Sequence, residues 1–133
     1  MLKLGPRSRL VIFLKLTALH SFSVGLGLIF LPAEYLEFFG FANTSACFFQ
    51  LQGGVFHLVM TIAYWLAAKY LEKSPGLIQF VITAKCMAFV FLIVYFFAIE
   101  SSWMVIASAA GDGLMALIIF ILYRHYEMNL EDI

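Results

Sequence analysis

The chain has 133 residues, of which 64% are hydrophobic and 12% charged, and its formal net charge is zero. A soluble domain is typically about 45–50% apolar and about 25% charged. The apolar excess is more than a soluble core of this length can bury, so the composition indicates a membrane protein. The balanced charge gives no basic surface of the kind that nucleic-acid binding requires, and no nucleic-acid partner is expected.

Four apolar segments are long enough to cross a membrane as helices, since spanning about 30 Å of hydrocarbon takes roughly 20 residues. They are predicted at about 11–31, 46–68, 77–99 and 104–123. Pro32 ends the first segment, and the pair Pro75-Gly76 precedes the third. We therefore expect an all-α polytopic membrane protein, a four-transmembrane-helix bundle that forms a single integral membrane domain over residues 1–133.

Lys and Arg are distributed unevenly among the predicted loops. They lie before the first segment, between the second and third, and after the fourth, as Lys3, Arg7, Arg9, Lys69, Lys73 and Arg124. The loops 32–45 and 100–103 contain Glu but neither Lys nor Arg. By the positive-inside rule both termini are cytoplasmic, and the predicted location is the cell inner membrane. Loop 32–45 is either a short interfacial helix or a plain connector, and the tail 127–133 is expected to be frayed.

One ionisable residue of each segment is predicted near the membrane midplane. At about 1.5 Å per residue, His20, His57, Lys85 and Asp112 lie about 12–17 Å from the cytoplasmic ends of their helices. A charged side chain there costs about 2.5–3.5 kcal/mol and normally faces the bundle interior, where it finds a partner. We expect these side chains to form one buried polar layer, and the polar residues expected to support it are Gln50, Gln52, Thr61, Tyr64 and Ser108.

The second segment carries its polar and small residues on one face. Gln50, Gly53, Gly54, His57, Thr61 and Tyr64 follow a three-and-four spacing, whereas Phe48, Leu51, Val55, Phe56, Val59 and Ile62 cover much of the remaining surface. This pattern predicts a helix that turns its apolar side to lipid. In the fourth segment, the pairs Ala107/Gly111 and Ala109/Gly113 have the spacing that allows close helix approach.

The polar layer has more than one interpretation. Lys85 and Asp112 are either a structural ion pair between the third and fourth helices or a proton, ion or substrate site. A third reading has Lys85 extending its side chain towards the cytoplasmic interface. His20 and His57 are either hydrogen-bonding partners within the layer or axial ligands of a b-type haem held between the first two helices. The sequence contains no recognisable motif for a metal ion or a nucleotide.

Three stretches, GLGLIFLPAEYLEFFGF, QLQGGVFHLVMTIAYWLAA and SAAGDGLMALIIF, together with the four short helices, resemble small bacterial membrane proteins grouped as DoxX-like. The resemblance extends over about residues 17–123 and rests on helix layout and on the positions of Gly, Pro and Asp. It implies a four-helix membrane protein, and members of this group include subunits associated with quinone-linked sulfur oxidation. It assigns no catalytic residue to this chain.

The sequence favours a non-enzymatic role, as a small accessory or scaffold protein with a polar interior layer. Two alternatives stay open. One is a membrane redox component that binds haem or quinone, and the other is a proton-coupled small-solute transporter that uses Asp112 and Lys85. A bundle this small has little space for an aqueous path, so transport would require an oligomer. The expected partners are the lipid bilayer and either further copies of the chain or a larger membrane complex.

Overall fold

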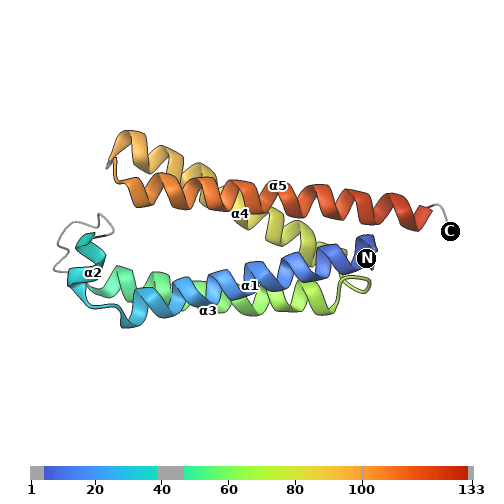
Figure 1. Cartoon of the computed structure of the whole chain (residues 1–133), viewed down its shortest axis with the longest axis horizontal. Coiled ribbons are helices and arrows are strands. Elements are labelled where there is room, and N and C mark those ends of the chain that lie inside the picture. Colours follow the sequence, from blue (N-terminus) through green and yellow to red (C-terminus); the bar gives the residue numbers. More distant parts are fainter. Residues whose placement is uncertain (1–4, 39–46, 100, 132–133) are drawn as a thin grey trace, which may run out of the picture.

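The computed structural model describes residues 5–38, 47–99 and 101–131, and in this part of the chain all regular structure is helical. The helices are α1 (Pro6–Phe30), α2 (Ala33–Phe38), α3 (Cys47–Lys69), α4 (Pro75–Ala98) and α5 (Trp103–Glu131). α1 packs chiefly against α3, and α4 chiefly against α5, so the long helices form two antiparallel hairpins. Further contacts join α1 to α5 and α3 to α4 (Figure 1).

Proline and short turns set the helix boundaries. α1 and α4 each begin with proline, whose fixed φ suits the first helical turn and whose missing N–H is not needed there. Pro32 follows the end of α1, where it cannot donate to the helix. A tight turn joins α3 to α4, in which the backbone N–H groups of Lys73 and Ser74 donate to the carbonyl of Tyr70 at 3.0 and 2.9 Å.

The predicted helices are all present, with one clear error at the C-terminal end. The prediction ended the last helix at residue 123 and left 127–133 frayed, whereas α5 continues as a regular helix to Glu131. The segment 124–131 exposes both polar side chains and the apolar Met128 and Leu130, but it places Tyr126 in the core at 7% exposure, and this packing keeps it helical. In loop 32–45, α2 agrees with the short-helix reading, and residues 39–46 lie outside the described part of the chain.

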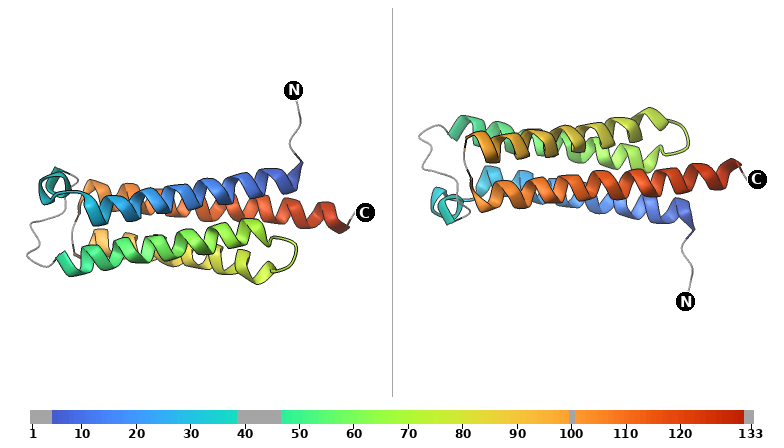
Figure 2. Two further views of the ribbon diagram at one scale, coloured as in Figure 1. Left: turned by 90° about the horizontal axis from the view of Figure 1, so that it is seen from below. Right: turned by 90° about the horizontal axis from the view of Figure 1, so that it is seen from above.

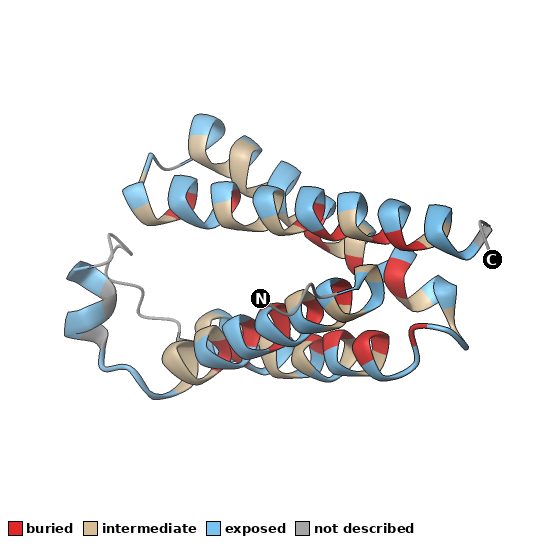
Figure 3. Cartoon of the chain, turned by 45° about the vertical axis from the view of Figure 1, so that its right-hand side comes forward, coloured by how far each residue is buried: buried red, intermediate tan, exposed pale blue. Residues whose placement is uncertain are grey.

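The apolar core lies at one end of the bundle. We call it the terminal end, where α1 begins, α3 connects to α4 and α5 ends; the opposite, turn end carries α2 and the α4–α5 turn (Figures 1 and 2). All four long helices contribute buried apolar side chains in this half, which are Leu10, Leu14, Ala18, Met60, Tyr64, Ala67, Ala68, Leu71, Ile78, Val81, Ile119, Tyr123 and Tyr126. Towards the turn end the two hairpins diverge, and the residues of α4 beyond Lys85 are exposed or half-buried (Figure 3).

Four helices, namely α1, α3, α4 and α5, are long and apolar enough to cross a membrane. The prediction for the faces of α3 is confirmed. Its apolar positions Phe48, Leu51, Val55, Phe56, Val59 and Ile62 are all exposed on the outside of the bundle. Its polar and small positions are buried or half-buried. An exposed apolar face of this extent is typical of a surface that contacts lipid or another protein.

Candidate functional site

The centre of the site is an ion pair between the two helices of the second hairpin. Lys85 Nζ of α4 lies 2.5 Å from Asp112 Oδ1 of α5, and the two side chains are 3% and 14% exposed. The lysine ammonium also lies 5.3 Å from the centre of the Tyr64 ring of α3, close enough for a cation–π contact. Lys85 is therefore paired with Asp112, and the two residues join α4 to α5.

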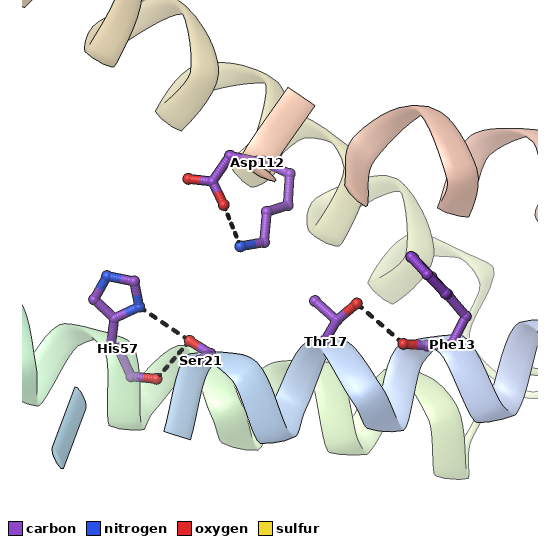
Figure 4. A network of polar contacts seen from close by, with 6 residues as sticks. Phe13, Thr17, Ser21, His57 and Asp112 are labelled. Atoms are coloured by element: carbon purple, nitrogen blue, oxygen red, sulfur yellow. Dashed lines mark hydrogen bonds and ion pairs between the residues drawn. The ribbon is translucent and has the colours of Figure 1, made fainter. Parts of the chain in front are cut away.

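A second polar contact joins the helices of the first hairpin. The Ser21 hydroxyl of α1 donates to the backbone carbonyl of His57 in α3 at 3.0 Å, and its oxygen lies 3.1 Å from Nδ1 of the same histidine. A hydroxyl carries one proton, and here that proton goes to the carbonyl. The hydrogen-bond network therefore places the proton of the neutral imidazole on Nδ1, which donates it to the serine oxygen. Nε2 is then an acceptor, on a ring that points towards the second hairpin (Figure 4).

Further hydrogen bonds keep the interior polar groups satisfied. Thr61 donates to the His57 carbonyl at 2.9 Å, and Thr17 donates to the Phe13 carbonyl at 3.0 Å. Gln50 of α3 donates to the Leu28 carbonyl of α1 at 2.7 Å, nearer the turn end. In the described part of the chain, every buried side-chain nitrogen or oxygen has a partner. The layer is therefore a completed set of contacts, which is the condition for polar groups to be tolerated in an interior.

Three of the predicted residues lie outside this buried set. His20 was predicted inside the layer, but its side chain is exposed, whereas the buried positions of α1 nearest to it are Thr17, Ala18 and Ser21. Gln52 and Ser108, predicted as supporting residues, are also exposed. The spacing along a helix does not determine these differences, because the direction of each side chain around the helix axis depends on which neighbour the helix meets.

Close packing of α1 on α3 explains why Ser21 reaches His57. A Cβ atom on Gly25 would lie 2.9 Å from the Gly54 carbonyl oxygen, and one on Gly54 would lie 3.0 Å from the Gly25 carbonyl oxygen. The two backbones are thus in contact one turn from Ser21. A haem plane between α1 and α3 would need several more ångströms of separation, so at the level of His57 these two helices leave no space for it.

Small residues also set the contact between α4 and α5. Ala109 is fully buried, and a Cβ atom on Gly113 would lie 2.9 Å from Phe89 of α4. The pair Ala109/Gly113 therefore marks the helix contact that its spacing predicted. The second pair does not, because Ala107 is exposed and Gly111 has nothing within 4 Å of an added Cβ atom.

Ser21 was expected on the same side of the first helix as Thr17 and His20, but it was not among the residues predicted to form or support the polar layer. A signal for it exists in the four-residue spacing of Thr17, Ser21 and Gly25, all of which are buried against α3. A line of small and hydroxyl-bearing residues in an otherwise bulky apolar helix is typical of a helix contact surface. The same signal distinguishes Ser21 from Ser23, which is exposed and bonds only the Leu19 carbonyl of its own helix.

The fold and the site together define an all-helical bundle of two hairpins, with an ion pair at the inner edge of its apolar core and four helices long enough to cross a membrane. Within the described residues, no group of three or more His, Cys, Asp or Glu side chains is arranged to hold a metal ion. Comparisons of the chain with protein-family models, with curated proteins and with solved structures found no match.

Proposed function

We propose that this protein is a multi-pass inner-membrane protein with both termini in the cytoplasm, and that it acts as a small non-enzymatic accessory or scaffold protein. The observation that carries this proposal is the Lys85–Asp112 ion pair, which is closed at 2.5 Å and shielded by Tyr64. Two charges that satisfy each other have a structural use: they set the position of α4 against α5 within an apolar bundle. The structural role of the pair is tested by the first experiment in the Discussion.

Membrane insertion and orientation have a direct test. In a protein whose native cysteines are replaced by serine, Ser101→Cys at the turn end should react with a membrane-impermeant maleimide in intact cells. Lys73→Cys, in the α3–α4 turn, should react only after the cells are opened, because the positive-inside rule puts the lysine-bearing loop in the cytoplasm. If Lys73→Cys but not Ser101→Cys is labelled in intact cells, the orientation is the opposite of the one proposed. Recovery of the protein in solution without detergent would contradict insertion.

A second candidate function is a proton-coupled carrier of a small solute. Two observations favour it: the hairpins diverge towards the turn end (Figure 3), and His20 is exposed while His57 is half-buried. Ionisable residues within membrane-spanning helices are typical of proton relays. The terminal side of the pair is filled by the apolar core, so transport would require the hairpins to separate at that end as well.

The carrier predicts proton movement in proteoliposomes. With pyranine inside, vesicles containing the wild-type protein should acidify faster after an external acid pulse than vesicles of lipid alone. The double variant Lys85→Met/Asp112→Leu should return the rate to that of lipid alone, while the exposed acid variant Glu72→Gln should keep the wild-type rate. Equal acidification by wild-type and protein-free vesicles would remove this candidate and leave the scaffold proposal in place.

A further inference from the structure

A shallow, half-open cavity lies on the surface of the first hairpin. It has a volume of about 290 Å³ and is lined by Val11, Lys15, Trp65, Ala68 and Lys69. Lys69 is the last residue of α3, so the cavity belongs to the terminal end of the bundle. Its walls are mainly apolar and consist of one indole ring, two small apolar side chains and the alkyl parts of two lysines.

The two lysines of this cavity are positively charged groups without a carboxylate partner. In the described part of the chain, the ion pairs are Arg7–Glu72, Lys85–Asp112 and Arg124–Glu127, and none includes Lys15 or Lys69. Each ammonium lies over an aromatic ring instead, at 5.4 Å from the Trp65 ring centre for Lys15 and 5.1 Å from the Tyr70 ring centre for Lys69. Such contacts hold an ammonium in place and leave its charge available to an anion.

Exposed apolar side chains lie close in sequence to the residues that line the cavity. Trp65 is 54% exposed, and the neighbouring side chains Ile12, Leu16 and Ile62 are 44%, 54% and 60% exposed. In a membrane these three side chains would contact acyl chains. An anion that occupies the cavity would therefore sit directly beside hydrocarbon, and tryptophan is the residue that favours this boundary between headgroups and acyl chains.

We propose that this cavity binds the headgroup phosphate of an anionic diacyl phospholipid, such as phosphatidylglycerol. Lysine is a point-charge partner for phosphate, and basic pockets between helices at the cytoplasmic side are suited to anionic lipid headgroups. A phosphatidylcholine headgroup contains the same phosphate but brings its own cation, which the two lysines disfavour. The inference rests on membrane insertion as proposed above, and it does not depend on the role of the Lys85–Asp112 pair.

Trp65 provides a reporter inside the cavity. In the Trp103→Phe variant it is the only tryptophan, and lipids with brominated acyl chains quench its fluorescence on contact. In mixed micelles or nanodiscs, brominated phosphatidylglycerol in phosphatidylcholine should quench Trp65 at a much lower mole fraction than brominated phosphatidylcholine in phosphatidylglycerol does. Each basic residue near anionic lipid contributes about a five-fold preference, so two lysines should give roughly 25-fold.

The variant Lys15→Gln/Lys69→Gln should lose this preference, and each single substitution should lower it about five-fold. The matched control Lys73→Gln/Arg124→Gln removes two exposed cations elsewhere at the terminal end and should keep it. Helical circular dichroism shows whether each variant is folded. The comparison of the two brominated lipids is made on the Trp103→Phe protein itself, so it does not depend on the folding of any lysine variant.

Three results would overturn the lipid site. These are equal quenching by the two brominated lipids, a preference that persists in Lys15→Gln/Lys69→Gln, and loss of the preference when inorganic phosphate is added, which would indicate a site for free phosphate. These outcomes are distinct from failure of the membrane proposal itself. A protein extracted from membranes only by detergent that shows no lipid preference refutes the lipid site alone, whereas a protein soluble without detergent refutes insertion.

Discussion

Replacing Lys85 by Met should lower the free energy of unfolding by about 3–5 kcal/mol, because it leaves the Asp112 carboxylate shielded from solvent without its partner. The double variant Lys85→Met/Asp112→Leu should recover most of this loss. An ion pair replaced by apolar groups of similar size is often neutral or stabilising, whereas a single buried charge is strongly unfavourable. The measurement is reversible unfolding by dodecyl sulfate in mixed micelles, followed by circular dichroism.

The matched control for this experiment is Lys73→Met, which removes an exposed lysine from the α3–α4 turn and should change stability by less than about 0.5 kcal/mol. If the single and double variants are equally destabilised, the pair is not a closed structural unit and the scaffold proposal fails. If the double variant is stable but loses the proton flux of the wild-type protein, the same two residues also serve the carrier function.

Gly25→Ala should destabilise the bundle by about 1–3 kcal/mol, the usual cost of forcing an extra group into a filled contact. The new Cβ atom would lie 2.9 Å from the Gly54 carbonyl oxygen and 2.9 Å from a methyl carbon of Leu58. The leucine can rotate, but the Gly54 backbone cannot move without shifting α3. A shift of α3 would also lengthen the Ser21–His57 hydrogen bonds one turn away, so the substitution should affect both the packing and the polar layer.

Gly111→Ala is the matched control, since an added Cβ atom there meets nothing within 4 Å. Alanine is the better helix former by about 1 kcal/mol in an exposed helix interior, so this variant should be neutral or slightly more stable. Both variants are compared by the same dodecyl sulfate titration. Equal stability of the two proteins would show that α1 and α3 are not held together by the Gly25–Gly54 contact.

The closed state of the polar layer bears on both functional candidates. A scaffold requires the Lys85–Asp112 and Ser21–His57 contacts to persist, since they hold α4 to α5 and α1 to α3. A carrier requires at least one of them to open during each cycle. The first experiment above measures how strongly the Lys85–Asp112 pair stabilises the bundle, and the second measures the packing of α1 on α3 that brings Ser21 to His57. A bundle that is hardly weakened by either change would be suited to movement.

Much of the architecture follows from composition and periodicity. The length of the apolar segments determines four long helices, and the three-and-four spacing along α3 determines which of its faces is apolar. Counting residues from the helix ends places Lys85 and Asp112 at one level, where they form the ion pair. These features depend on local geometry alone, because rise and turn per residue are the same in every α-helix.

The tertiary structure decided which of the polar residues meet. His20 and His57 have similar predicted depth, yet His57 is bonded to Ser21 while His20 is exposed. Of two small-residue pairs with identical spacing, only Ala109/Gly113 forms a helix contact. Spacing determines a face of a helix but not the neighbour that the face meets, because that choice depends on how all four helices pack.

The same reason explains the cavity of the first hairpin and the long final helix. Lys15, Trp65 and Lys69 belong to α1 and α3, and only the pairing of these helices brings them to one cavity. The tail 127–133 was expected to be frayed because it is short and acidic, but α5 continues to Glu131, and the burial of Tyr123 and Tyr126 supports its last turns. The sequence by itself determined the four long helices, and the packing determined their partners, because contacts between distant segments are a property of the whole bundle.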